Sequence, residues 1–489
     1  MRKMPFLSLL VLAACLLFFS CDSEEQADSP KAVVIKVPED LLGASGSTGD
    51  EGGGERPEAW NVIHELGIQW VTRMFRWGDF QKINHDDPDD PEAGWNWTEM
   101  DTYVRTVKKN GMKIIGTIGC DDKAVFIDED FDGRWTKDPG HFVPVRHIPM
   151  YEKYVKKLVQ HYSYNDDPEL KVDAWEIWNE GNFYPTWWYG THDEFYKLHK
   201  AVSEAVREVN PDVPLLGFCA NSINYDEWTK NLVSGGFAPK DKLNGAAFHP
   251  YAKDPAATMM HMQIFGSRVA AGGFDEIWVT EVGYPYGGMS YPTIIDRKYN
   301  ASFTVATIAL LAANNVPRIL WYQFSKNGLT NRNVNPHTFE GNDPEDYFQM
   351  TWWYHESDNN WKCKYEDSAI AYTLASKHIP GSTYRSNLPK RQGIPDSVES
   401  LYFEGKNGSH ALLLWNTKPT TRTVKVTLPG TDQTLHDMDY DTWDRTDSNK
   451  PKINPKSIEG TTTIELKTNV VKFYSWKNTG STVPVIAGQ

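Results

Sequence analysis

The feature that most constrains the fold of this 489-residue chain is an alternation of short apolar segments and helical patterns between residues 32 and 385. Helical stretches place apolar residues three and four positions apart, as in Met100, Tyr103, Val104 and Val107. Alternating strands and helices favour a parallel sheet covered by helices, and about eight such repeats close a barrel. The strands are expected at 32–37, 70–76, 112–119, 172–178, 214–218, 243–249, 277–280 and 318–324. We therefore predict the α/β class, with a (β/α)8 TIM barrel over residues 32–385.

After about residue 385 the helical spacing disappears and short alternating segments take its place. Val424, Val426 and Leu428 occupy every second position of one such segment. Turn residues separate the segments, which is typical of a small antiparallel β-sandwich. We expect this sandwich over residues 386–489, with a structural or accessory role because no catalytic residue types cluster there.

The N-terminus has the composition of an export signal. Arg2 and Lys3 precede an apolar run, Phe6–Ser20, that is too short for a comfortable membrane span. Cys21 follows this run and is itself followed by acidic residues, which resembles the lipobox and surface-export signal of Bacteroidetes lipoproteins. We predict a signal peptide at 1–20, lipidation of Cys21 and a flexible tether at 21–31. A lipobox ending at Cys15, or a plain secretory signal, are the alternatives.

Charge and cysteine content exclude several functions. The net charge of −15 argues against nucleic acid as a partner, because phosphates would be repelled. Cys120, Cys219 and Cys363 are too few and too irregularly spaced for a disulfide framework or a zinc site. Asp128–Gly133 matches the start of a calcium loop, but Pro139 stands where that loop needs a bidentate glutamate. We therefore expect neither a metal nor a cofactor.

Two predicted strands end in a glutamate. Glu180 closes the segment that contains Trp175–Asn179, and Glu281 follows Ile277–Thr280. In the predicted barrel these are strands four and seven, and the carboxyl ends of the strands form the active-site face. Two carboxyl groups in one pocket are the equipment for glycoside hydrolysis. We expect them to lie about 5 Å apart, the spacing of enzymes that retain the anomeric configuration.

These segments resemble the clan A glycoside hydrolases, retaining β-glycosidases built on TIM barrels, and most of all families 39 and 5. The resemblance covers residues 32–385. It implies that Glu180 is the acid/base and Glu281 the nucleophile, and that Asn179 binds the sugar 2-hydroxyl. It also implies that His249 and Tyr251 position the nucleophile and the substrate.

Three further residues are candidates for substrate binding. Arg73 matches an arginine near the end of strand two, with Arg76 as the second choice, and Trp321 matches a tryptophan near the end of strand eight. Aromatic residues are abundant in this chain, and their flat faces can stack on sugar rings. Trp77 is one of them. A structural ion pair is the alternative for Arg73, and core packing is the alternative for both tryptophans.

Together these features predict a retaining β-glycoside hydrolase that cleaves a β-linked polysaccharide in an endo fashion. Exo action on oligosaccharides, or glycan binding without catalysis, are the alternatives. The expected partners are the polysaccharide or oligosaccharide substrate and the outer membrane, reached through the lipid anchor. The expected location is the cell surface, because acidic residues follow Cys21, and display there favours internal cleavage of a polymer too large to import.

Overall fold

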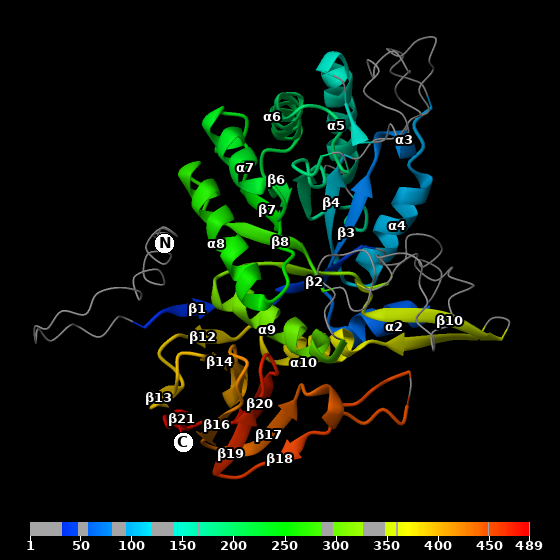
Figure 1. Ribbon diagram of the computed structural model, residues 1–489. Coiled ribbons are helices and arrows are strands. Elements are labelled where there is room, and N and C mark those ends of the chain that lie inside the picture. The colour runs from blue at the N-terminus through cyan, green and yellow to red at the C-terminus, as the bar shows by residue number, and fades with distance from the viewer. Residues whose placement is uncertain are drawn as a thin grey trace, which may run out of the picture.

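The computed structural model describes residues 32–46, 57–80, 94–119, 141–143, 145–163, 167–184, 186–284, 297–325, 348–357, 360–447 and 449–488. Eight parallel strands close into a barrel in chain order, which confirms the predicted fold class (Figure 1). They are β2 (Leu42–Ser45), β3 (Trp70–Phe75), β4 (Lys113–Ile118), β5 (Ala174–Ile177), β6 (Leu215–Asn221), β7 (Gly245–His249), β8 (Ile277–Val282) and β9 (Ile319–Tyr322).

A helix follows each barrel strand. In chain order these are α2 (Pro57–Leu66), α4 (Thr98–Lys109), α5 (Ile148–Ser163), α6 (His192–Val209), α7 (Tyr225–Ser234), α8 (Pro255–Ala271), α9 (Asn300–Ala313) and α10 (Asp367–His378). Their starts are chemically defined: Thr191 and Glu194 form a capping box at α6, and Asp254 caps α8 directly before Pro255. No helix among the described residues combines the length and apolar character of a membrane span.

The barrel interior consists of an apolar layer beneath a polar one. The apolar layer is a buried cluster that includes Trp70, Ile115, Ala174, Leu216, Ala247, Trp278 and Leu320. Because side chains alternate along a strand, residues two positions later face the interior again, nearer the carboxyl ends. Those positions hold Thr72, Thr117, Glu176, His249, Thr280 and Tyr322. The apolar layer thus closes the barrel and supports a polar floor for any pocket above it.

The predicted first barrel strand is wrong. Residues 34–36 form β1 (Val34–Lys36), which pairs antiparallel with β12 (Thr383–Arg385) outside the barrel. Only the middle residue of β1 is buried, which suits an exposed sheet edge, whereas all four residues of β2 are buried. β2 takes the place of the expected first barrel strand and pairs with β3 and β9. It requires Gly43, because a Cβ there would lie 2.6 Å from the Trp70 carbonyl oxygen.

The C-terminal region forms the predicted sandwich of two sheets. The larger sheet has the order β1-β12-β14-β15-β20-β17-β18, and the smaller has the order β13-β21-β16-β19. The strands of these sheets not given above are β13 (Lys390–Gln392), β14 (Val398–Glu404), β15 (Ser409–Asn416), β16 (Arg422–Thr427), β17 (Thr431–Asp437), β18 (Lys456–Ser457), β19 (Thr461–Leu466), β20 (Lys472–Lys477) and β21 (Val485–Gly488). Outside the sandwich lie α3 (Trp77–Phe80) and the hairpin of β10 (Thr351–Ser357) and β11 (Asn360–Tyr365).

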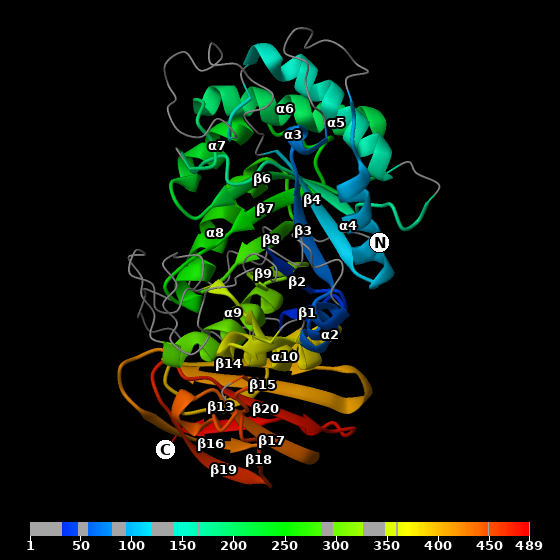
Figure 2. The ribbon, with the colours of Figure 1, turned by 90° about the vertical axis from the view of Figure 1, so that its right-hand side faces the viewer.

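The larger sheet packs directly on α9 and α10 (Figure 2). Phe403, Leu413 and Phe473 of this sheet belong to the same buried cluster as the barrel helices. Polar contacts cross the same boundary: the Val471 amide donates to Ser302 Oγ at 3.1 Å, and Arg445 makes two bonds of 3.0 and 2.8 Å to the Asp367 carboxylate. One face of the larger sheet therefore shares a buried cluster with the barrel helices, while the space between the two sheets is filled by a separate cluster.

We predict that Asp367→Asn destabilises the protein by about 1–3 kcal/mol, because it leaves the Arg445 guanidinium beside a neutral amide in a largely buried site. The Asp367 side chain is only 3% exposed. The urea midpoint of unfolding measures the effect. Lys406→Ala is the matched control, since its pair with Glu39 also joins the two regions but is exposed. It should change stability by less than about 0.5 kcal/mol. Equal shifts for both variants would contradict the prediction.

Candidate active site

A pocket of about 870 Å³ lies at the carboxyl ends of the barrel strands. Its volume falls in the range of about 300–1,000 Å³ that is typical of ligand sites. Polar residues from most of the strands line it, among them Ser45, Thr72, Arg73, Thr117, Glu176, Asn179, Glu180, Asn221, Tyr251, Glu281 and Tyr322. The polar layer of the barrel interior is therefore the pocket floor.

Glu180 and Glu281 come together in this pocket. One carboxylate oxygen of each, and a ring nitrogen of His249, lie within 4.8 Å of one another. The predicted proximity of the two glutamates is confirmed. Retaining glycosidases keep their two carboxyl groups about 5–5.5 Å apart, whereas inverting enzymes need about 6.5–9.5 Å to admit a water molecule.

Glu180 is held in one orientation. Its Oε1 accepts hydrogen bonds from Asn221 Nδ2 at 2.7 Å and from His249 Nδ1 at 2.8 Å. Asn221 is itself fixed, because its backbone N–H donates to Asn182 Oδ1 at 2.8 Å. The backbone here is strained: Trp178 and Glu180 have φ angles of 61° and 48°, a region that residues other than glycine rarely adopt. Such strain concentrates at functional sites.

Glu281 lies in β8 and accepts two hydroxyl hydrogen bonds. Ser45 Oγ donates to its Oε1 at 3.0 Å, and the Tyr251 hydroxyl donates to its Oε2 at 2.9 Å. Both donors favour the ionised carboxylate. The tyrosine was expected beside this glutamate, but Ser45 and Asn221 were not predicted as site residues.

His249 links the two glutamates. Its Nδ1 lies 2.8 Å from Glu180 Oε1 and 3.5 Å from Glu281 Oε2, and its Nε2 lies 3.1 Å from Thr280 Oγ1. Burial alone would lower the pKa of His249, but the negative charges of Glu281 and Glu180 outweigh it and raise the pKa to about 9. The imidazole is therefore a buried cation at neutral pH.

The same neighbours act on Glu281. Burial and the nearby Glu180 raise the pKa of Glu281 to about 7, against the opposing effects of the His249 cation and the Tyr251 hydrogen bond. Burial also raises the pKa of Glu176, which lies deeper in the barrel. Glu281 is thus mainly ionised only above about pH 7.

Two other predicted site residues line the pocket and two do not. Asn179 is buried in the pocket wall, and Arg73 also lines it, with its guanidinium 5.2 Å from the centre of the Tyr103 ring. Trp77 and Trp321 are each only 1% exposed and are absent from the lining, so their prediction as substrate-binding residues is wrong.

The errors have simple geometric causes. Trp77 begins α3, which turns its ring onto Tyr151 and Tyr154 of α5. Trp321 faces outward toward Phe303 of α9, while the next residue, Tyr322, faces the pocket. Side chains alternate along a strand, so an error of one position exchanges the two faces.

Several known proteins are similar to this chain. The model of the family "Glycosyl hydrolases family 39" matches residues 61–270. Among solved structures, a family 39 glycoside hydrolase from Bacteroides cellulosilyticus WH2 is 16% identical with a TM-score of 0.61, covering 90% of this chain and 81% of that one. A monomeric β-xylosidase from Caulobacter crescentus CB15 is 13% identical with a TM-score of 0.58, covering 91% and 98%. A family 30 endoxylanase from Clostridium papyrosolvens C71 is 13% identical with a TM-score of 0.53, covering 91% and 98%.

At these identities the solved structures establish a shared fold. The fold, the paired glutamates and the family 39 match together indicate the class of protein, a glycoside hydrolase. Residues 61–270 are similar to family 39 of that class.

We predict that Tyr251→Phe moves the acidic limb of the kcat/KM profile upward by about one pH unit. The Tyr251 hydrogen bond favours the Glu281 anion, so its loss raises the pKa of Glu281, and a contact to a charged group is worth about 1.4 kcal/mol or more. The expected nucleophile reacts as the anion, so activity should then be lost at higher pH. The measurement uses an aryl β-glycoside. Tyr225→Phe, whose hydroxyl contacts His261 away from the pocket, is the control and should leave the limb in place.

Proposed function

We propose that this protein is a retaining β-glycoside hydrolase that cleaves a β-linked polysaccharide internally, with Glu180 as acid/base and Glu281 as nucleophile. The observation that carries the proposal is the position of the two carboxylates within 4.8 Å of each other in one pocket. That proximity favours the spacing of retaining enzymes over the about 6.5–9.5 Å of inverting ones, and in the retaining mechanism the second carboxylate attacks the sugar directly.

In the first step Glu281 attacks the anomeric carbon while Glu180 gives its proton to the leaving oxygen, and the glycosidic bond breaks. The new charge on Glu180 forms beside its two donors, Asn221 Nδ2 and the His249 cation. Preorganised donors of this kind stabilise developing charge without reorganisation. In the second step Glu180 takes a proton from water, which attacks the same carbon and releases Glu281. Asn179 would bond the sugar 2-hydroxyl throughout.

Two observations support a polymeric substrate. The pocket volume of about 870 Å³ is near the upper end for ligand sites and suits more than one sugar ring. Trp187 and Phe183 also line the pocket, on the segment directly after the acid/base. Aromatic faces there can support the part of the chain that leaves first. The fold alone does not choose between endo and exo action, since its solved relatives include both an endoxylanase and a β-xylosidase.

Purified protein incubated with a panel of β-linked polysaccharides should release a ladder of oligosaccharides early in the reaction. Release of monosaccharide alone would favour exo action.

Substitution of the two glutamates should give different losses. Glu180→Gln should lower kcat on a natural polysaccharide by about 10²–10⁴-fold, the usual worth of general acid catalysis, and much less on aryl glycosides with good leaving groups. Glu281→Gln should abolish turnover of both, because an amide cannot attack as an anion. Glu208→Gln, on the exposed surface of α6, is the control. Equal losses on both substrates for Glu180→Gln would contradict its role as acid. A binding protein without catalysis would turn over neither substrate.

We also propose that the enzyme is a lipoprotein of the outer membrane, displayed at the cell surface. The support lies in residues 1–31, outside the described residues: a basic start, a short apolar run, Cys21 and the acidic residues behind it. A polar tether would let the barrel reach bulky polysaccharide while it stays anchored.

Cys21→Ser should release the protein from the membrane fraction without changing its activity in solution, since the cysteine carries only the anchor. Cell fractionation measures the release. Cys363→Ser, which alters a cysteine of the folded region, should remain membrane-bound. Retention of the Cys21→Ser variant, or failure of added protease to reach the wild type on whole cells, would contradict the proposal.

A further inference from the structure

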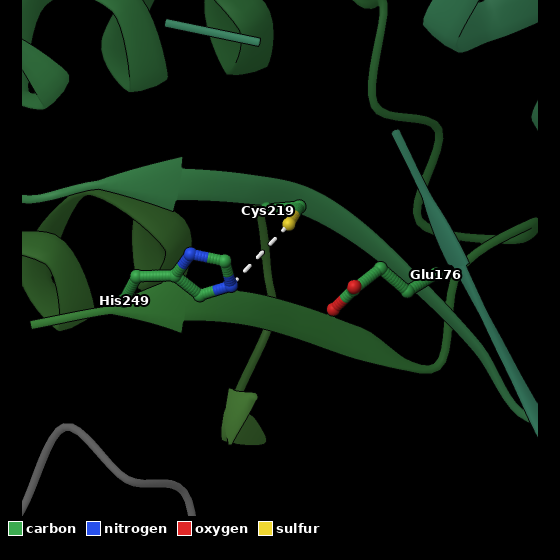
Figure 3. A group of neighbouring side chains, drawn as sticks. All are labelled: Glu176, Cys219 and His249. Carbon is green, nitrogen blue, oxygen red and sulfur yellow. Dashed lines mark hydrogen bonds between the residues drawn. The ribbon is translucent and has the colours of Figure 1, made fainter. Parts of the chain in front are cut away.

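A second cluster of chemically reactive side chains lies beneath the catalytic pair. Glu176 of β5, Cys219 of β6 and His249 of β7 point from three neighbouring strands to one place in the barrel interior (Figure 3). A carboxylate oxygen, the thiol sulfur and a ring nitrogen lie within 4.8 Å of one another, and all three residues are buried. Cys219 Sγ and His249 Nε2 are 3.6 Å apart.

Packing alone does not explain this cluster. Glu176 is 2% exposed, and its Oε1 accepts a hydrogen bond from Thr117 Oγ1 at 2.9 Å. Its Oε2 makes no hydrogen bond of normal geometry among the described residues, although the Thr280 hydroxyl and the Cys219 thiol lie near enough to interact with this carboxyl group. Leaving a buried polar atom without a well-formed hydrogen bond is energetically costly. Because Glu176 also lines the pocket, this oxygen can bind a ligand that enters from the pocket.

The backbone of β6 is bent so that Cys219 reaches the cluster. Phe218 and Cys219 have φ angles of 72° and 39°, and the pairing of β6 with β7 shifts register between Gly217 and Ala220. A bulge re-aims the side chain that it carries. Here it turns the thiol into the barrel interior beside His249. Left-handed conformations of residues other than glycine cost about 1–3 kcal/mol each, so this arrangement is maintained against strain.

The three side chains are the ligand types of zinc. Thiolate, imidazole and carboxylate bind Zn²⁺ at about 2.3, 2.0–2.1 and 2.0–2.2 Å, and a tetrahedral angle between the first two bonds places sulfur and nitrogen about 3.6 Å apart. The observed separation of Cys219 Sγ and His249 Nε2 is 3.6 Å. The other ring nitrogen of His249 is bonded to the Glu180 carboxylate at 2.8 Å, which is the usual outer partner of a metal-bound histidine.

We propose that Glu176, Cys219 and His249 form a binding site for Zn²⁺, or a divalent ion of similar softness, beneath the catalytic glutamates. This departs from the expectation that the chain binds no metal. Binding releases the proton of the Cys219 thiol, the Nε2 proton of the His249 imidazolium, and that of Glu176 when it is protonated, and no group is oxidised or reduced. The ion reaches the site through the pocket, whose floor includes Glu176 and Thr117.

The expected consequence is inhibition, and this part rests on the proposed function. An ion bound to Nε2 of His249 lies directly below the ring whose Nδ1 holds Glu180 at 2.8 Å, so it disturbs the contact that orients the proposed acid. The site would therefore make the enzyme sensitive to free zinc. Glu180, His249 and Glu281 form another cluster within 4.8 Å that shares His249. Cys219 belongs only to the lower cluster, so it distinguishes the two.

Calorimetric titration of the purified protein with ZnCl₂ should show saturable binding at one site. Cys219→Ser should weaken this binding by more than about 100-fold, because loss of a ligand exceeds the roughly 10–100-fold effect of losing an outer partner. Glu176→Gln should also weaken it. Cys363→Ser is the matched control, since it removes the other described free cysteine, on β11, and should leave Zn²⁺ affinity and activity unchanged. Co²⁺ should give a thiolate charge-transfer band in the wild type and the control, but not in Cys219→Ser.

The proposal is overturned if the wild type shows no saturable Zn²⁺ binding, if Co²⁺ gives no thiolate band, or if Cys219→Ser and the wild type bind Zn²⁺ equally. The last result would place the metal on the upper carboxylates. Activity assays separate this proposal from the proposed function. Zinc binding that depends on Cys219, in a protein that hydrolyses no glycoside, would sustain the metal site and reject the enzyme. Hydrolysis that zinc does not affect, in a protein that binds it through Cys219, would overturn the inhibitory role.

Discussion

The chemistry of this barrel depends on one buried imidazolium. His249 is fully buried and its charge offsets three carboxyl groups, Glu176, Glu180 and Glu281, in the same interior. An isolated carboxylate moved out of water loses several kcal/mol of solvation, and a paired cation is what makes burial possible. Without His249, burial and the neighbouring carboxyl groups would raise the pKa of Glu281 further, because the His249 cation opposes both. The positive charge therefore orients Glu180 through a hydrogen bond and favours the ionised form of Glu281.

The alternation of side chains along the barrel strands is what places this imidazolium in the interior, above an apolar layer. Residues two positions apart on each barrel strand share the interior face, so an apolar layer and a polar layer are stacked by the same sequence alternation. The apolar layer, with Trp70 and Trp278 in edge-to-face contact, excludes water from below. The polar layer is open to the pocket only from above. Charges between them interact in a low-dielectric space, which strengthens every hydrogen bond that orients Glu180 and Glu281.

Features that depend on local sequence were predictable. Features that depend on which face of a strand a side chain occupies, or on a strand partner far away in the chain, were less so. Helical spacing predicted the buried face of α4, with Met100, Tyr103, Val104 and Val107, and strand-end glutamates predicted the pair that meets in the pocket. The assignment of Trp321 failed because one position along β9 reverses the side chain. β1 was misplaced because its partner is about 350 residues away, and pairing at that distance leaves no local signal.

Some site residues had a signal that sequence reasoning did not use. Glu176 lies inside the predicted strand at 172–178, where a charged residue is unusual unless it faces a polar interior. Ser45 and Asn221 had none, because their roles follow from contacts with Glu281 and Glu180 that only the closed barrel creates. Cys219 faces the interior through a bulge, which spacing alone does not reveal.

The C-terminal sandwich is connected to the active site through the last helix of the barrel. α10 lies between the larger sheet and β2, and its buried Tyr372 donates a hydrogen bond of 2.9 Å to the carbonyl oxygen of Gly43. Two residues further along β2, Ser45 donates to the carboxylate of Glu281. β2 is short, and Gly43 adds no side chain to anchor it, so its position depends on β3, β9 and α10. A helix packed on two sides moves less than one with a solvated face. The sandwich thus contributes to the site by fixing the strand that carries the hydroxyl partner of the proposed nucleophile.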